Sequence, residues 1–221
     1  MIELYAWSTP NSMKVSIMLE ECGLPYRIQS IDITTNAEQL TPEYLKINPN
    51  GKVPSIVDPD ALNGMGIAMM ESGAILIYLA EKVGRFFDPH DRYVILQWLM
   101  FQMGGVGPSF GQAHHFMRAK KDEIPYGTER YGKETRRLYG VMDRRLGESR
   151  YFAGSYSIAD IAIYPWVWRH GWHRVDLAEF PNVKRWYTEV GIRPAVAKGM
   201  AALDPSRLRA IAAQKTAPAV S

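Results

Sequence analysis

Strand patterns are confined to the part of this sequence that precedes a break at 84–90. Before the break, short alternating apolar segments are separated by helical ones, whereas almost no strand pattern follows it. Gly84, Asp88 and Pro89 interrupt the periodicity there. A length of 221 residues suits one large domain or two small ones. The predicted division is an α/β domain at 1–83, a linker at 84–90, an all-α domain at 91–203 and a tail at 204–221, which we expect to be disordered from Thr216 onward.

The N-terminal segments follow the order β-α-β, an irregular helix, then β-β-α. Ile2–Ala6 alternates as a strand, and the helix after it carries an apolar stripe that Gly23 ends. Ser72 is predicted to be the N-cap of the last helix. Further strands are predicted at 26–33, 52–57 and 67–70. The strand–helix–strand unit predicts a parallel pair, and the proximity of the last two strands predicts an antiparallel hairpin.

Helical patterns fill the second part of the chain. The segment 93–103 is apolar nearly all round, which predicts a buried helix. The glycine-rich run 104–108, which ends in a proline, is expected to bend or end that helix. Ser157 and Asp160 form an S-x-x-D capping box before an apolar run, and Pro181 is predicted to open another helix.

Charge and cysteine content exclude several classes of function. The 26 basic and 23 acidic residues leave a formal net charge of +3, which is too small to indicate nucleic-acid binding. The single cysteine, Cys22, can form neither an intramolecular disulfide nor a CxxC redox motif. The sequence shows no signal peptide and no apolar run of the roughly 18 residues that a membrane span needs. We therefore expect a soluble, cytoplasmic protein that binds neither nucleic acid nor membrane.

Three segments follow one another in a definite order along the chain. They are Thr9–Val15 running into Leu19–Glu21, then Asn48–Pro54, then Glu71–Ser72 with the apolar segment Ala74–Leu79. Each is weakly specific alone, but their order and spacing together resemble the cytosolic glutathione transferase family over residues 1–203. The capping box occupies the family's place in the helical domain. The resemblance implies a thioredoxin-like α/β domain (βαβ-ββα), a cis Val53–Pro54 bond and an all-α C-terminal domain.

Within that family the sequence most resembles the bacterial nu class, whose relatives include the yeast nitrogen-regulator prion protein. The segments behind this resemblance are Thr9–Asn11, Glu71–Ile75, Gly111–Phe116, Ile124–Tyr126 and Glu129–Tyr131. The class implies a homodimer that binds glutathione as a co-substrate and uses it to reduce disulfide bonds. It also implies that classical conjugation of glutathione is weak.

The implied chemistry depends on a glutathione thiolate. A free Cys thiol has a pKa near 8.5, and lowering it by about two units requires the anion to be stabilised by roughly 2.7 kcal/mol relative to the thiol. Hydrogen-bond donors at a helix N-terminus can supply this. By resemblance these donors are Thr9 and Asn11, while the alternative is that both only cap the helix. Most classes carry Tyr, Ser or Cys in place of Thr9, which argues against strong conjugating activity.

The resemblance places further contacts in the first domain. Glu71 and Ser72 resemble the γ-glutamyl site, where the start of a helix suits the carboxylate and Glu71 suits the ammonium group. An ordinary N-cap is the alternative for Ser72. Val53 would offer its backbone to the cysteinyl unit, because Pro54 cannot extend the strand ladder.

Three further side chains complete the implied glutathione contacts. Lys52 and Gln39 would reach the glycine end of the ligand. Arg130, in the second domain, would reach a carboxylate as a charge-assisted partner. The alternative for Lys52 and Arg130 is a merely solvated side chain.

Other candidate residues favour structural roles. His114 and His115 are adjacent and therefore point apart on a helix, so we expect no metal site. Cys22 falls on the apolar face near the end of its helix, where the dipole disfavours a thiolate, which predicts a structural thiol. A tryptophan cluster could stack nucleobases, although its helical pattern favours core packing: Trp166, Trp168 and Trp172.

Three functional hypotheses follow. The first is a glutathione-dependent disulfide-bond reductase, in which a bound thiolate attacks a disulfide and a second glutathione resolves the mixed disulfide. The second is a glutathione S-transferase or peroxidase acting on electrophiles or hydroperoxides. The third is a glutathione-binding regulatory protein without turnover. In the first, glutathione supplies both sulfurs of the redox cycle, because Cys22 is not placed as a nucleophile.

Overall fold

A computed structural model describes residues 1–61, 64–119 and 124–216. By internal contacts the chain forms two compact units. Unit 1 combines Met1–Arg85 with Pro194–Ser221, and unit 2 is Phe86–Arg193. The expected architecture, an α/β unit with a mixed sheet and a helical unit, is confirmed. The predicted disorder falls largely on 217–221, outside the described residues.

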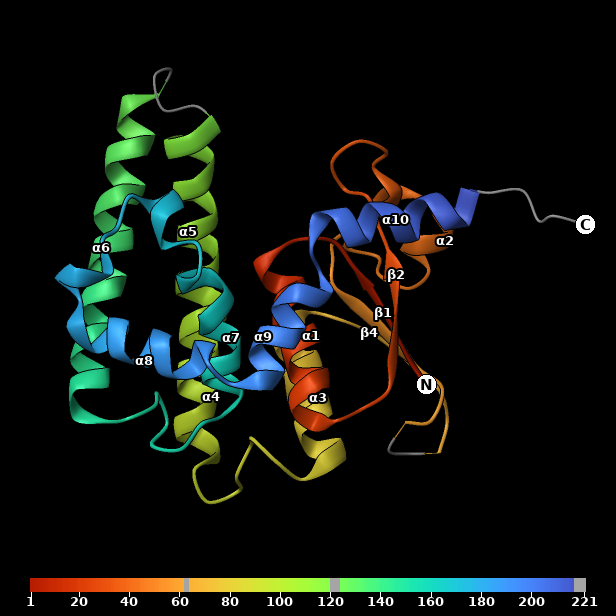
Figure 1. Ribbon diagram of the computed structural model, residues 1–221, viewed down its shortest axis with the longest axis horizontal. Helices are drawn as coiled ribbons and strands as arrows, with labels where there is room; N and C mark the ends of the chain where they lie inside the picture. The colour runs from red at the N-terminus through yellow and green to blue at the C-terminus, as the bar shows by residue number, and fades with distance from the viewer. Residues whose placement is uncertain (62–63, 120–123, 217–221) are drawn as a thin grey trace, which may run out of the picture. The chain divides into compact units, whose positions relative to one another are not determined.

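Unit 1 contains a four-stranded mixed sheet (Figure 1). Its strands are β1 (Ile2–Ala6), β2 (Tyr26–Ser30), β3 (Ser55–Asp58) and β4 (Ile67–Met70), in the order β2-β1-β3-β4. β1 and β2 are parallel, while β3 runs antiparallel to both β1 and β4. The predicted parallel pair and hairpin are therefore confirmed. Alternation places Leu4 and Ile56 on the buried side, each fully inaccessible to solvent.

Helices α1 (Pro10–Cys22) and α3 (Ser72–Val83) pack against each other in unit 1. Thr9 caps α1, and Gly23 ends it at φ 68°, a left-handed conformation that glycine adopts without a steric penalty. The irregular segment between β2 and β3 holds a short 3₁₀ helix, η1 (Glu38–Leu40), and α2 (Pro42–Leu45). The Val53–Pro54 bond is cis, as the resemblance implied.

The C-terminal segment belongs to unit 1, which differs from the predicted division at 203. Helices α9 (Pro194–Ala202) and α10 (Pro205–Thr216) pack on α1 and β2, respectively. The Ser16 hydroxyl donates to the carbonyl of Gly199 at 2.7 Å. Gly199 lies so close to the backbone of Ile17 that a Cβ would be 2.5 Å from the Ile17 Cα. This backbone contact, which periodicity cannot show, makes 194–203 part of unit 1.

Unit 2 is helical throughout, apart from isolated bridges within Tyr151–Ser155, in the part of the chain that the structure describes. Its longer helices are α4 (Arg92–Phe101), α5 (Gly107–His114), α6 (Pro125–Glu148), α7 (Ile158–Val167) and α8 (Pro181–Gly191). Short π turns occupy η2 (Gln102–Val106) and η3 (His115–Ala119), and 3₁₀ turns occupy η4 (His170–His173) and η5 (Leu177–Glu179). Tyr139 and Trp186 lie in its core.

One prediction for the region around α4 is corrected, and one of the two alternatives for the glycine-rich run is removed. α4 is not a buried helix: only Ile95 and Leu99 are buried, while Tyr93 is 83% exposed and Met100 is 51% exposed. An apolar helix face stays exposed when no other part of the chain packs on it, and composition alone does not reveal this. The glycine-rich run does not end the helix. The π turn η2 takes up part of it, and the helix continues as α5 (Figure 1).

The predicted capping box of α7 is confirmed and forms the polar centre of unit 2. Asp160 is fully buried and accepts hydrogen bonds from the Ser157 N–H at 3.0 Å and the Trp186 indole N–H at 2.9 Å. The Phe152 N–H donates to the same carboxylate at 3.2 Å. Burial raises the pKa of Asp160 to about 6, and these donors act in the opposite direction.

Among the described residues, none of the helices combines the length and the apolar character that a membrane-spanning helix requires.

We expect Gly199→Ala to destabilise the protein by about 1–3 kcal/mol, the usual cost of overpacking. The added methyl group would meet the Ile17 backbone, which cannot move aside as a flexible side chain can. Gly104→Ala is the matched control, because nothing lies within 4 Å of its Cβ position. Urea unfolding of both variants measures the effect, and equal stabilities would contradict the packing of α9 on α1.

Candidate functional site

Four segments of unit 1 leave the sheet at the same end. Tyr5 pairs with Ser55, and Ser55 pairs with Met70, so the end of β1, the start of β3 and the end of β4 are adjacent. β2 runs parallel to β1, with Ala6 opposite Ser30, so the chain after β2 starts from this end too. The register therefore brings together the segments that carry the predicted site residues of this unit: Thr9, Asn11, Gln39, Lys52, Val53, Pro54, Glu71 and Ser72.

Thr9 and Asn11 occupy the first turn of α1. The Thr9 hydroxyl oxygen accepts from the Ser12 N–H at 3.1 Å, so Thr9 caps α1, while its contact with a ligand stays a prediction. Capping uses a lone pair, and the hydroxyl hydrogen is directed to the Ser12 Oγ at 3.0 Å. Because a hydroxyl can rotate, it can cap the helix and still donate to a bound anion. Asn11 is half-buried one residue after the N1 proline of α1.

The segment before β3 has a backbone that a ligand could pair with. In the described turns and loops, Val53 forms no backbone–backbone hydrogen bond. The carbonyl of Lys52 is fixed by the Tyr44 hydroxyl at 2.6 Å and by the Asn48 amide at 2.7 Å, while the Lys52 side chain is exposed. An extended ligand could therefore pair with Val53 without any rearrangement of its neighbours.

Glu71, and not Ser72, is the N-cap of α3, which corrects the predicted cap. The Glu71 carbonyl accepts the first helical bond, from Ile75 N–H at 2.9 Å, and Ser72 is already helical. Glu71 has φ 65° and ψ 108°, a strained conformation for a residue with a side chain. The backbone N–H of Ser72 therefore belongs to the first turn of α3, whose donors lack partners within the helix. Strain of this kind is concentrated at ligand-binding sites.

Lys14 is a residue to which the sequence analysis assigned no role. Its side chain is fully buried, and its ammonium group donates to the Ser72 Oγ at 3.2 Å. Burial lowers the pKa of Lys14 to about 7, while the Glu71 carboxylate acts in the opposite direction. The sequence contained one signal of this burial. Lys14 lies four residues before the buried Met18 and therefore on the same face of α1.

Gln39, in η1, has a buried side-chain oxygen without a hydrogen-bond partner among the described residues. A buried amide oxygen of this kind is costly unless something supplies a donor. The backbone carbonyl of Gln39 lies near Gly51, which precedes Lys52. A ligand that brought an N–H group to this position would satisfy the Gln39 oxygen, so the predicted residues fit a peptide-like ligand.

Arg130 lies on α6 in unit 2, away from the other predicted residues in sequence. It is exposed and lines a pocket of about 660 Å³ together with Ser109, Tyr131 and Arg137. The pocket belongs to unit 2 alone. The contact of Arg130 with a carboxylate stays a prediction.

His114 packs against the rings of Trp166, Trp172 and His173 in unit 2. The rings of His114 and His173 stack at 4.4 Å, and burial lowers their pKa values to about 4 and about 2. Trp166 is buried as predicted, whereas Trp168 and Trp172 are 44% and 39% exposed. The described residues contain no group of three or more His, Cys, Asp or Glu side chains that could hold a metal ion.

Cys22 lies at the last residue of α1, at the opposite end from Thr9. Its thiol is half-buried, with the Leu79 carbonyl 3.9 Å from the sulfur. Burial raises the pKa of Cys22 to about 11. The predicted structural role of this thiol agrees with both observations.

Comparisons with known proteins show what the chain is similar to. The model of the glutathione S-transferase N-terminal domain matches residues 9–82, and that of the C-terminal domain matches residues 112–194. The disulfide-bond oxidoreductase YfcG of Escherichia coli strain K12 is 47% identical over 204 residues, covering 90% of this chain and 94% of that protein.

Two solved structures are similar in both sequence and fold. A glutathione transferase from Pseudomonas putida, with one glutathione disulfide bound per subunit, has a TM-score of 0.85 and 45% identity, covering 90% of each chain. A family member from Pseudomonas fluorescens Pf-5, with two glutathione molecules bound, has a TM-score of 0.86 and 45% identity. It covers 90% of this chain and 92% of that one.

We expect Cys22 to react slowly with a thiol-specific reagent in the folded protein. With a pKa of about 11, its thiolate fraction near pH 8 is on the order of 0.1%, about a hundredfold or more below that of a free cysteine. Following 5,5′-dithiobis-(2-nitrobenzoic acid) colour development with and without urea measures the difference. Equally rapid labelling of folded and unfolded protein would show that the thiol is activated.

Proposed function

This chain belongs to the glutathione S-transferase family, and on that premise we propose that it reduces disulfide bonds with glutathione. Two similar proteins bind glutathione or its disulfide, and a third is a disulfide-bond oxidoreductase. The observation that carries the proposal is the separation of the two ends of α1. The N-terminal end offers Thr9 and Asn11 as donors, and the C-terminal end holds Cys22 with a raised pKa.

The redox sulfur must therefore come from the ligand. The glutathione thiolate, stabilised by Thr9, Asn11 and the N-terminus of α1, attacks one sulfur of the acceptor disulfide. A mixed disulfide forms, and the other acceptor sulfur leaves as a thiolate. A second glutathione thiolate then attacks the mixed disulfide at the glutathione sulfur, which gives oxidised glutathione and releases the second acceptor thiolate. Two protons from solvent complete the reduced product.

Different segments of unit 1 bind different parts of the glutathione molecule. The first turn of α3, with Ser72, holds the γ-glutamyl carboxylate, and Glu71 meets its ammonium group. Val53, held before Pro54, pairs with the backbone of the cysteinyl unit. Lys52 and Gln39 bind the glycine end, where the unpartnered Gln39 oxygen supports a ligand N–H.

The protein acts as a homodimer. The exposed face of α4 supports this, because Tyr93, Val94 and Met100 leave large apolar side chains open to solvent. Arg130 binds a carboxylate of the ligand, which its exposed position on α6 permits. The acceptor is a small disulfide, and the reaction takes place in the cytoplasm, whose glutathione pool is kept reduced.

We expect Thr9→Val and Asn11→Ala each to lower turnover of 2-hydroxyethyl disulfide by about 10- to 100-fold, the usual effect of removing a hydrogen bond to a charged group. Thr9→Val also removes the α1 cap and costs about 1 kcal/mol of stability. Turnover is followed by coupling oxidised glutathione to glutathione reductase, with ultraviolet absorbance of the bound thiolate as a second readout.

Cys22→Ala is the control, with turnover expected within about twofold of wild type, since no step uses this thiol. A large loss in Cys22→Ala would contradict the source of the sulfur. Parallel assays with a chloronitrobenzene and cumene hydroperoxide separate the alternatives. A conjugation or peroxidase rate far above the disulfide rate would replace the proposal, and saturable binding without turnover would indicate a regulatory role.

A further inference from the structure

The hydroxyl groups of Thr9 and Ser12 form a pair at the N-terminal end of α1. Their oxygens lie 3.0 Å apart, with Thr9 as the donor, and the Ser12 N–H donates to the Thr9 oxygen at 3.1 Å. The Ser12 side chain is fully inaccessible to solvent, whereas Thr9 is half-buried. Among the described residues, the Ser12 hydroxyl has Thr9 as its only hydrogen-bond partner.

Two hydroxyl hydrogens compete for this one contact. A hydroxyl group carries one hydrogen and two lone pairs, so only one of the two hydrogens can lie between the oxygens. In the structure it is the Thr9 hydrogen, which leaves the buried Ser12 hydrogen without an acceptor among the described residues. A buried donor of this kind is costly. If the bond reversed, Ser12 would have its acceptor, and the Thr9 hydrogen would turn away from Ser12.

A thiolate beside Thr9 would favour the reversed bond. The Thr9 oxygen would then accept from both the N–H and the hydroxyl of Ser12, which occupies both of its lone pairs. An anion that approaches Thr9 would meet only the hydrogen. The Thr9 hydroxyl would also be a stronger donor, because a hydroxyl that accepts hydrogen bonds is polarised by them. A neutral thioether would gain much less, since uncharged sulfur is a weak acceptor.

We propose that Ser12 is a positioning residue for the glutathione thiolate: binding of the anion reverses the Thr9–Ser12 hydrogen bond, so that Ser12 donates to Thr9 and Thr9 donates to the sulfur. The proposal rests on the proposed function, because it takes Thr9 as a donor to glutathione. Both hydroxyl groups keep their hydrogens and only rotate. Ser12 does not touch the ligand and acts through Thr9.

Ser12→Ala tests this role on a helix that should remain intact. The variant keeps the backbone N–H that Thr9 caps, and alanine is the strongest helix former. We expect the pKa of the bound glutathione thiol to rise by about half a unit to one unit, because one polarising hydrogen bond is lost. Titrating the ultraviolet absorbance of the thiolate in the complex with the full chain measures this. The affinity for S-methylglutathione, which has no thiol to ionise, should stay within about twofold of wild type.

Turnover should show the same change as a pH dependence. A raised pKa lowers the thiolate fraction below that pKa and has no effect once the thiol is fully ionised. Turnover of 2-hydroxyethyl disulfide by Ser12→Ala should therefore fall by about three- to tenfold at low pH and match wild type above both pKa values. A merely structural defect would lower turnover at every pH.

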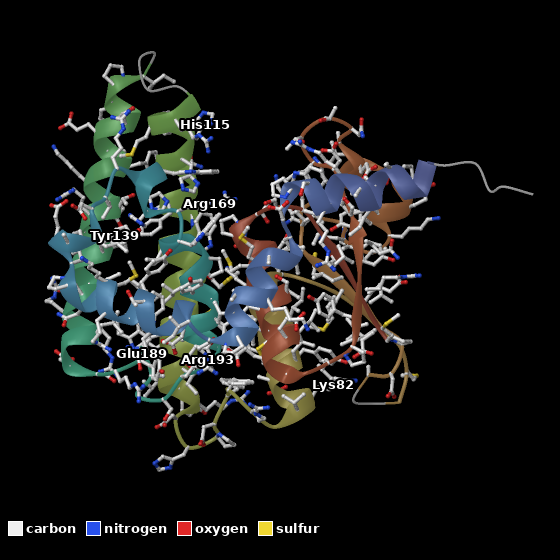
Figure 2. The ribbon with its side chains drawn as sticks, in the orientation of Figure 1. Lys82, His115, Tyr139, Arg169, Glu189 and Arg193 are labelled. Atoms are coloured by element: carbon white, nitrogen blue, oxygen red, sulfur yellow. The ribbon has the colours of Figure 1, made fainter. Side chains whose placement is uncertain are left out.

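The other charges around α1 are the same in wild type and Ser12→Ala. Lys14 titrates in the same range, because burial lowers its pKa to about 7, and Lys82, labelled in Figure 2, pairs with Asp58 at 2.9 Å. The difference between the two titrations therefore reports the Ser12 hydroxyl. The charged side chains on α1, and those on β1, α3 and α9 with the α3 N-cap, are Lys14, Glu20, Glu21, Glu3, Glu71, Glu81, Lys82 and Lys198.

Ser16→Ala is the matched control. Ser16 lies one turn further along α1 and is equally inaccessible, but its hydroxyl donates to the Gly199 carbonyl at 2.7 Å. Its loss should lower the thermal stability and leave the pKa of the bound thiol unchanged. Because Ser12 acts through Thr9, adding Ser12→Ala to Thr9→Val should cause no further rise in that pKa. If Ser12→Ala does not fold, Ser12→Gly removes the same hydroxyl and takes its place.

The outcomes separate the role of Ser12 from the proposed function. A wild-type thiol pKa in Ser12→Ala would overturn that role and leave the glutathione site intact. An equal rise in Ser16→Ala, an equal rise in the Thr9→Val background, or a matching loss of S-methylglutathione affinity would overturn it as well. Failure of the wild-type protein to bind S-methylglutathione, or a bound thiol with the pKa of free glutathione, would overturn the proposed function and the role of Ser12 with it.

Discussion

The pairing of Ser55 with both Tyr5 and Met70 is the constraint on which the site in unit 1 depends. It aligns the ends of three strands whose flanking segments are far apart in sequence. A register shift of one residue would turn the buried side chains of β3 to the other face of the sheet, so the buried Ile56 opposes such a shift. The positions of the donors in α1, before β3 and in α3 are therefore consequences of core packing.

Much of unit 1 could be predicted from the sequence, because its signals are local. Gly23 after an apolar stripe and the alternation in Ile2–Ala6 each report on nearby backbone, and both features occur as expected. The cap of α3 could not be placed in the same way. Ser72 is a good capping residue, but the chain reaches α3 through a strained Glu71, and strain is set by tertiary contacts.

In unit 2, the sequence pattern predicted less reliably which side chains are buried. The apolar sequence of α4 does not show whether other parts of the chain cover a given helix face or leave it exposed to solvent, and Tyr93 is exposed. The same ambiguity applies to Trp168 and Trp172. Long-range contacts also escaped prediction: nothing near Gly199 indicates that its backbone meets Ile17. The predicted glutathione contacts came from an ordered set of motifs, whereas the bond of the buried Lys14 to Ser72 becomes visible only when side chains are placed.

The path of the chain has a consequence for biosynthesis. Unit 1 is assembled from two segments that flank unit 2 in the sequence, one up to Arg85 and one from Pro194. A ribosome that has made the sheet, α1 and α3 has not yet made α9, so the surface of Ile17 and Ser16 stays uncovered while the whole helical unit is translated. The packing of α9 on α1 can therefore form only after 194–202 has been synthesised, and until then the Ile17 surface that α9 covers stays exposed on the nascent chain.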